Sequence, residues 1–138
     1  MSANDFNRQI IEEFRANDGR VGGVFKGASL LLLHHTGARS GTERVNPLAY
    51  QRLDDGTVAV FASKGGAPTN PDWYHNLVAN PNAHIEIGTN AYDVIARVAS
   101  GDERDRIWET QKRANPNFAE YEQKAGGRLI PVVVLEKS

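Results

Sequence analysis

The feature that most constrains the fold is a series of short strand-like segments joined by tight polar turns. The segments span residues 29–35, 44–53, 57–63, 83–87, 91–98 and 130–135. Asp54-Asp55-Gly56 and Gly88-Thr89-Asn90 are turns typical of β-hairpins. About six strands joined mainly by hairpins cannot form a parallel sheet with regular crossovers. The sequence therefore predicts a small, mainly antiparallel β-barrel with flanking helices, of the α+β class.

Helical patterns surround these strands. Phe6, Ile10 and Phe14 recur on one face of a helix predicted over residues 4–16. The opposite face carries mixed charge, which favours packing on the barrel over anchoring to a membrane. A link to residue 27 follows, and residues 28–138 are expected to hold the barrel and its site, so that residues 1–138 form a single domain.

Three further helices are predicted from their start signals. Asn70-Pro71-Asp72 supplies a capping residue, a proline at the first helical position and an acid in the first turn. Ser100 and Glu103 form a capping box, and Asn117 with Glu120 repeats its spacing. Each signal is expected to begin a helix at its position.

Composition excludes several classes of function. With 16 Lys and Arg against 17 Asp and Glu, the net charge of −1 gives no bulk attraction to nucleic acid or to an anionic membrane. The absence of cysteine excludes disulfides, thiolate zinc sites and cysteine nucleophiles. The longest apolar run, residues 30–33, is too short to span a bilayer, and no secretory signal begins the chain. A cytoplasmic protein is expected.

The histidines do not predict a metal site. His34 and His35 are neighbours in a predicted strand, so their side chains are expected on opposite faces, while His75 and His84 stand alone in the sequence. No nucleophile lies in a sequence motif with an obvious base. Covalent hydrolysis is therefore poorly supported.

The most unusual stretch, residues 34–44, holds two arginines, two glycines and several hydroxyls. Glycines let the backbone approach a phosphate, and the guanidinium groups of Arg39 and Arg44 can bind an anion through paired hydrogen bonds. Ser63-Lys64-Gly65-Gly66 repeats the combination of a cation with glycines. A polar hairpin loop with solvated arginines explains the composition equally well. Arg104, in a predicted first helical turn, is expected to be exposed.

Three motifs, taken together, resemble the deazaflavin-dependent nitroreductase family. They are Thr36-Gly37-x-Arg39-Ser40-Gly41-x-x-Arg44-x-x-Pro47, then Ala62-Ser63-Lys64-Gly65-Gly66, then Asn70-Pro71-x-Trp73-Tyr74-x-Asn76-Leu77-x-Ala79-Asn80-Pro81. The resemblance covers roughly residues 28–136. It implies a split β-barrel, similar to that of FMN-binding proteins, and the deazaflavin coenzyme F-420.

The resemblance also implies roles for individual residues. The residues that would hold the acidic tail of the coenzyme are Arg39, Ser40, Gly41 and Arg44, with Lys64 adding charge nearby. Those that would line the ring or the surrounding cleft are Asn46, Pro47, Ala62, Ser63, Gly65, Gly66, Pro71, Trp73, Tyr74 and Asn76. Trp73, Phe118 and Tyr121 would face the substrate, and Ser63 or Tyr121 would hydrogen-bond its oxygen as catalytic residues. Phe118 has no hydroxyl and cannot donate such a bond.

The activity implied is hydride transfer from the reduced coenzyme to a small electrophile, such as a quinone, an enone or a nitroaromatic compound. Two alternatives remain open at this stage. One keeps the barrel and replaces the coenzyme by FMN, whose phosphate also suits the arginines. The other is a barrel that binds lipids or cofactors without catalysis. The sequence leaves the oligomeric state open, a homodimer included.

Overall fold

The computed structural model describes residues 3–17, 30–53, 57–63, 66, 69–126 and 128–138, with the side chains of α1 from Arg8 onward. In chain order the elements are α1 (Ala3–Ala16), β1 (Leu30–Thr36), β2 (Glu43–Arg52), β3 (Val58–Phe61), α2 (Asp72–Ala79), β4 (Asn82–Ile87), β5 (Asn90–Val98), α3 (Gly101–Ala114), α4 (Asn117–Lys124) and β6 (Val132–Lys137). Every strand predicted from the sequence is present.

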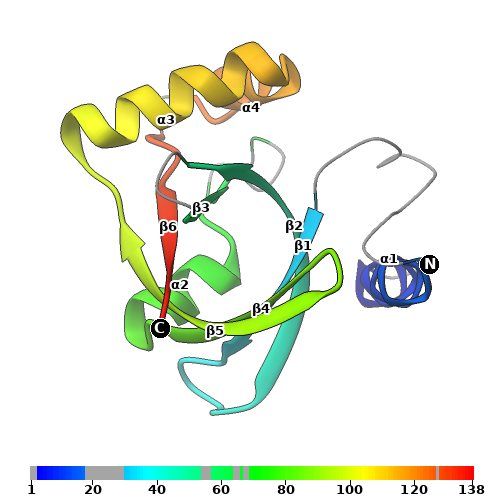
Figure 1. Ribbon diagram of the computed structural model, residues 1–138. Coiled ribbons are helices and arrows are strands. Elements are labelled where there is room, and N and C mark those ends of the chain that lie inside the picture. Colours follow the sequence, from blue (N-terminus) through cyan, green and yellow to red (C-terminus); the bar gives the residue numbers. More distant parts are fainter. Residues whose placement is uncertain (1–2, 18–29, 54–56, 64–65, 67–68, 127) are drawn as a thin grey trace.

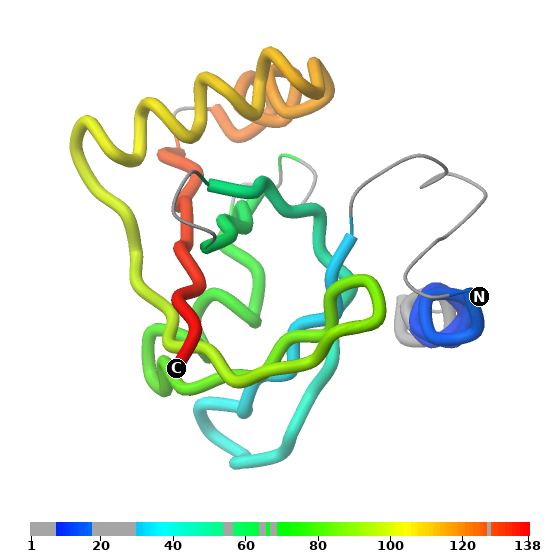
Figure 2. Tube along the Cα trace, viewed as in Figure 1, coloured from blue at the N-terminus to red at the C-terminus, as the bar shows by residue number. Residues whose placement is uncertain are grey.

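The strands form a closed barrel in the order β1-β2-β3-β6-β5-β4, and every neighbouring pair is antiparallel (Figure 1). Closure occurs where β1 pairs with β4, from Leu31 opposite Ile87 to His34 opposite His84. The tube along the chain shows the strands enclosing one ring, with α1, α3 and α4 outside it (Figure 2). The predicted antiparallel barrel of the α+β class is confirmed.

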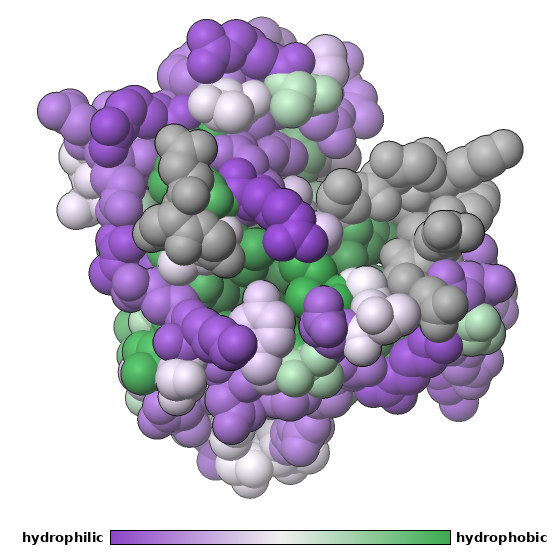
Figure 3. All heavy atoms as spheres, viewed as in Figure 1, coloured by the Kyte–Doolittle hydropathy of each residue, from purple (hydrophilic) through white to green (hydrophobic). Residues whose placement is uncertain are grey.

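Alternating side chains divide the apolar residues between the two faces of the barrel wall. Leu31 and Leu33 point inward, where Trp73 and Leu77 of α2 join the same core. On the outside, α3 and α4 cover a second core that contains Phe61 and β6. In the view of Figure 3, hydrophobic atoms gather in the central hollow and hydrophilic side chains surround it.

The first helix covers the outer face of β1. Ile10 and Phe14 pack against Leu30 and Leu32, as the helical periodicity predicts; the side chain of Phe6 lies outside the described part. Arg15 donates two hydrogen bonds to the carboxylate of Glu86 on β4, at 3.1 and 2.7 Å. Among the helices that the structure describes, none is long and apolar enough to cross a membrane.

The predicted side-chain cap of α2 is wrong. The helix begins at Asp72 and its N-cap is Pro71, without a side-chain cap bond. The amide oxygen of Asn70 instead accepts a hydrogen bond from the guanidinium of Arg128. A charge-assisted bond to arginine is stronger than a neutral one, which explains why Asn70 does not cap the helix.

The predicted capping box of α3 is also wrong, although Ser100 does occupy the N-cap. The carboxylate of Glu103 receives two bonds from Arg97 on β5, at 2.6 and 3.1 Å, and the side chain of Ser100 forms no cap bond. At α4 the N-cap is Pro116, and the N–H of Asn117 is bound by the side chain of Asn115. Residues of neighbouring turns and strands thus provide hydrogen bonds in place of the capping bonds that the sequence predicted.

Arg104 is buried, contrary to expectation, with 8% of its surface exposed. Its guanidinium lies over the ring of Trp108, with its central carbon 5.3 Å from the ring centroid, and donates to the carbonyl oxygen of Ile130 at 2.8 Å. The side chain therefore ties α3 to the chain just before β6. A long aliphatic stem makes such burial feasible for arginine.

Gly66 permits a close approach between the turn after β3 and α4. Its φ is +86°, and a Cβ atom there would lie 2.6 Å from the Cβ of Lys124 and 2.9 Å from the carbonyl oxygen of Tyr121. These distances are shorter than van der Waals contact. Only glycine fits this position without moving the helix.

Gly66→Ala is expected to lower the free energy of unfolding by about 1–3 kcal/mol more than Gly88→Ala. Gly88 has a similar positive φ of +57° but no atom within 4 Å of its added Cβ, so the two variants share backbone strain and differ in the clash. Urea unfolding of both variants measures the difference. Equal losses of unfolding free energy in the two variants would show that α4 can move away from residue 66 without an energetic cost.

Glu86→Gln is expected to weaken the attachment of α1 in a pH-dependent way. The hydrogen bond from Arg15, followed by that from His34, lowers the pKa of Glu86 to about 2 from 4.5. The ionised carboxylate thus stabilises the fold fully above about pH 4.5, and this contribution is lost as the pH falls towards 2. We expect the variant to be less stable by about 1 kcal/mol at pH 7, because the pair is partly solvated.

Thermal unfolding at pH 7 and at pH 2.5 tests this expectation, with Glu12→Gln on the exposed side of α1 as the control. The deficit of Glu86→Gln should shrink at the lower pH. A deficit that is the same at both values would contradict the role assigned to the carboxylate.

Candidate functional site

The loop between β1 and β2 is a compact turn. The N–H of Gly37 donates to the carbonyl oxygen of Thr42, and the N–H of Gly41 donates to that of Gly37, both at 2.9 Å. The hydroxyl oxygen of Ser40 accepts from the N–H of Thr42 at 3.2 Å. A Cβ on Gly37 would lie 2.6 Å from this hydroxyl oxygen, so a larger residue there would force the Ser40 side chain to move. The turn leaves Arg39 exposed at its tip.

A polar network fixes this turn to α2. The N–H of Ala38 donates to the amide oxygen of Asn76 at 2.9 Å. The amide nitrogen of Asn76 lies 3.0 Å from Nδ1 of His35, and Nε2 of His35 lies 2.7 Å from the amide oxygen of Asn46. Both asparagines were predicted site residues, and the structure joins them through His35. The amide of Asn76 is thus engaged at both its oxygen and its nitrogen, and the amide of Asn46 at its oxygen.

The turn and α2 enclose a pocket of about 470 Å³. Its lining residues are Gly37, Ala38, Arg39, Ser40, Arg44, Asp72, His75 and Asn76. Within the part of the chain that the structure describes, neither Arg39 nor Arg44 forms an ion pair. Two guanidinium groups without a carboxylate partner fit the phosphate or carboxylate groups of a ligand.

A second turn follows β3, where the N–H of Gly66 donates to the carbonyl oxygen of Ser63 at 3.0 Å. Arg128 stabilises this turn, because its guanidinium donates to the carbonyl oxygens of Ala62 and Ser63 at 3.0 and 2.8 Å. No local sequence pattern announces Arg128, because Ala62, Ser63 and Asn70 lie 58 to 66 positions before it. Lys64 and Gly65 lie outside the described residues.

The predicted aromatic wall is mostly buried. Trp73 is 5% exposed in the barrel core, and Phe118 is 6% exposed, with ring centroids 5.5 Å from Phe61 and 6.0 Å from Trp108. Tyr121 is half-buried and packs on Phe118. The rings of Trp73 and Phe118 therefore serve packing in this conformation. Their contact with a substrate stays a prediction.

The remaining predicted residues lie along the barrel wall and its end. Pro47 is half-buried on β2, opposite Leu32, and Pro71 is buried at the start of α2. The N–H of Ala62 donates to the carbonyl oxygen of Pro131 at 3.0 Å. Tyr74 borders an apolar pocket of about 180 Å³ between α2 and β5.

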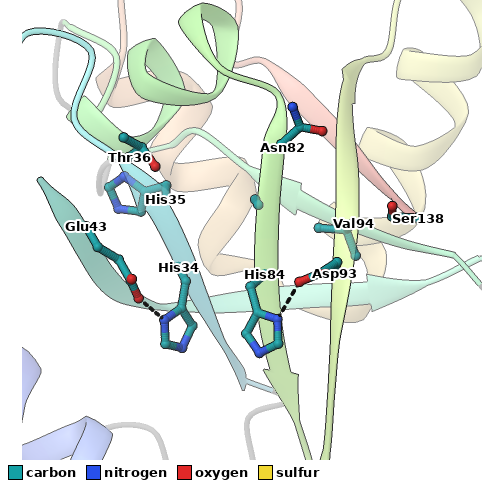
Figure 4. Close-up of a pocket in the computed structure, with 10 residues that line it drawn as sticks. His34, His35, Thr36, Glu43, Asn82, His84, Asp93, Val94 and Ser138 are labelled. Carbon is teal, nitrogen blue, oxygen red and sulfur yellow. Dashed lines mark hydrogen bonds and ion pairs between the residues drawn. The ribbon is translucent and has the colours of Figure 1, made fainter. Parts of the chain in front are cut away.

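The outer face of the barrel carries a separate histidine cluster beside a pocket of about 560 Å³ (Figure 4). Nδ1 and Nε2 of His34 lie 2.7 Å from Glu43 and 2.5 Å from Glu86. His84 is not isolated as expected: it faces His34 across the strands, with ring centroids 5.2 Å apart, and Nδ1 contacts Asp93 at 2.9 Å. The contact with His34 lowers the pKa of Glu43.

His34 and His35 do point to opposite faces, as predicted (Figure 4). In the ranges that the structure describes, no three His, Asp or Glu side chains are arranged to hold a metal ion. The outer cluster serves to connect β1, β4 and, through Glu86, the first helix.

Known proteins provide an independent comparison. A model of the F-420H(2)-dependent quinone reductase family matches residues 6–137. An F-420H(2)-dependent quinone reductase of Mycobacterium tuberculosis is 39% identical over 127 residues, covering 90% of this chain and 85% of that protein.

Two solved structures agree with this assignment. One, described as an F-420-H2 dependent reductase, is 40% identical with a TM-score of 0.70, over 78% of this chain and 94% of that one. Another, described as a domain-swapped dimer, is 36% identical with a TM-score of 0.72, over 98% and 100% of the two chains. The match to the family model and the identity to its members establish that this chain belongs to the F-420H(2)-dependent quinone reductase family.

Proposed function

We propose that this protein transfers a hydride from reduced coenzyme F-420 to a quinone. The observation that carries the proposal is the pair of guanidinium groups of Arg39 and Arg44, which have no ion-pair partner among the described residues and lie at a hydrogen-bonded turn in a chain of this family. Enones and nitroaromatic compounds are the further electrophiles that the same chemistry would accept. The reduced deazaflavin supplies the hydride from carbon 5 of its ring.

The residues of the first turn would bind the acidic tail of the coenzyme. Arg39 and Arg44 would pair with its phosphodiester and carboxylate groups, while Ser40 and the backbone at Gly41 would add neutral contacts. The exposed position of the turn supports this role, since a long charged tail can remain partly in water. By the family motif, Lys64 would add positive charge near the same acidic tail.

The second turn and the barrel wall would receive the ring. Gly66 packs against the backbone of Tyr121, and its N–H donates to the carbonyl oxygen of Ser63. The Ser63 or Tyr121 hydroxyl would hydrogen-bond the substrate oxygen on which negative charge develops. The remaining residues assigned to the coenzyme cleft are Asn46, Pro47, Ala62, Gly65, Pro71, Trp73, Tyr74 and Asn76.

The proposal extends to assembly and location. The domain-swapped dimer among the similar structures supports a homodimer, which the molar mass in solution would test. A cytoplasmic location fits a chain without cysteine, and cell fractionation would test it.

Arg44→Ala is expected to weaken coenzyme binding roughly ten- to a hundredfold, since a charge-assisted bond to phosphate contributes about 1.5–3 kcal/mol. The rate of hydride transfer at saturating coenzyme should change less, because the tail contact is the same in the ground state and the transition state. Titration of the coenzyme's fluorescence measures the dissociation constant.

Arg106→Ala is the matched control for charge, because Arg106 is exposed on α3. Arg104 does not serve, since it is buried against Trp108. If both variants bind the coenzyme with equal affinity and unchanged melting temperatures, the phosphate site lies elsewhere.

Coenzyme F-420 is expected to bind more tightly than FMN, because its tail is longer and more acidic than riboflavin phosphate. Its affinity should fall as salt is added, since ion pairs at an exposed turn are screened. Parallel titrations with both cofactors at low and high salt measure this. Stronger binding of FMN would overturn the choice of cofactor, and absence of menadione reduction by the reduced coenzyme would favour a non-catalytic binding barrel.

A further inference from the structure

His35 occupies a special position at the end of β1. Its neighbours inside the barrel are Leu31 and Leu33, yet it is polar and only 3% exposed. Both ring nitrogens are engaged, Nε2 with Asn46 on β2 and Nδ1 with Asn76 on α2. The side chain therefore joins three elements at the barrel end where the first turn begins.

The network specifies one tautomer of this ring. The amide oxygen of Asn76 accepts from the N–H of Ala38, so the amide nitrogen of Asn76 faces Nδ1 and donates to it. Nδ1 must then be the acceptor, and Nε2 carries the proton that it donates to the amide oxygen of Asn46. The chain of hydrogen bonds runs from Asn46 through His35 and Asn76 to the backbone of Ala38. All of these bonds can form together only when His35 is neutral.

We propose that His35 is a positioning residue for coenzyme binding: its unprotonated Nδ1 orients the amide of Asn76, which in turn holds the backbone of Ala38 and presents Arg39 and Arg44 to the acidic tail. The proposal rests on the proposed function only in that the turn binds the coenzyme. The orientation of the turn by His35 is a property of the protein alone.

Protonation of His35 would break this arrangement. A proton on Nδ1 would face the amide hydrogens of Asn76, and if that amide rotated, its nitrogen would face the N–H of Ala38 instead. Either way one bond of the network is lost. The turn would then sample other conformations, and ordering it again would reduce coenzyme affinity.

The surroundings keep the ring neutral near pH 7. Burial is the largest influence and lowers the pKa of His35 from 6.5; the positive charge of Arg44 on β2 and His34 on β1 act in the same direction. The bond to Asn46 and the charge of Asp72 on α2 oppose them. His84 and Asp93, on β4 and β5 across the neighbouring pocket, pair with each other.

Two substitutions by amide side chains separate the two bonds of the ring. His35→Asn places an oxygen near the position of Nδ1 and keeps an acceptor for Asn76, whereas His35→Gln places an amide near Nε2 and keeps only the bond to Asn46. Both leave a smaller, uncharged side chain in the same cavity. His84→Gln removes an imidazole outside the turn and serves as the control.

We expect His35→Gln to bind coenzyme F-420 roughly three- to tenfold more weakly than the wild type at pH 7.5, the range of one hydrogen bond. His35→Asn should stay within about threefold of the wild type. From pH 8 to pH 5.5 wild-type affinity should fall relative to that of His35→Asn. The ratio of dissociation constants at each pH cancels the titration of the coenzyme itself. Equal losses in both variants, or a wild-type pH profile retained in His35→Asn, would overturn the proposal.

A measurement on the wild-type protein without coenzyme depends neither on the proposed function nor on whether the variants fold. In NMR spectra of the wild type, the amide resonance of Ala38 should titrate with the same midpoint as the imidazole of His35, below 6.5. The same midpoint should persist in His84→Gln. An Ala38 resonance that ignores the His35 titration would overturn the positioning role, whereas a normal titration without coenzyme binding would refute only the proposed function.

Discussion

The complete burial of four consecutive leucines on β1 is the constraint from which the rest of the structure follows. Leu31 and Leu33 require an apolar interior, and Leu30 and Leu32 require a cover on the outside. A strand buried on both faces must also have both edges paired, because unpaired backbone groups in such a place cost free energy. The strand therefore pairs with β2 and β4 at once, closes the barrel, and needs α1 as its outer layer.

Two histidines near the end of the same strand, His34 and His35, contact different kinds of partner. His34 continues the outer face and meets carboxylates of β2 and β4. His35 continues the inner face and contacts two asparagine amides beside the turn that carries Arg39. The same alternation that points the leucines inward and outward places the carboxylate contacts of His34 on the outer face and the amide contacts of His35 on the inner face. A rigid barrel end results, on which an exposed turn with two arginines is held in a fixed orientation.

The sequence predicted the barrel well because its hairpin turns and alternating strands are local signals. It predicted helix starts less well: Glu103 was assigned to a capping box and binds Arg97, while Asn70 was assigned to a cap and binds Arg128. In both cases an arginine distant in the sequence or on another element provides the stronger partner. Arg104 was expected in solvent, since no local pattern announces the ring of Trp108 beneath it.

The candidate site shows the same limit. Motif similarity predicted Arg39, Arg44 and Asn76 together, but the link between Asn76 and His35 spans 41 positions and has no local signature. Burial of Phe118 against Phe61 depends on how α4 packs over the barrel, which periodicity alone does not determine.

The carbonyl clamp made by Arg128 has a consequence for biosynthesis. Its guanidinium reaches back 65 and 66 positions to the oxygens of Ser63 and Ala62, so the turn after β3 lacks this support until the final segment has been made. Contacts of such long sequence separation form late, because the intervening chain must first be ordered. A nascent chain still on the ribosome would thus complete the turn after β3 only once Arg128 has been made. Chains truncated before Arg128 would lack both this clamp and β6, so the turn after β3 would lose its support from the end of the chain.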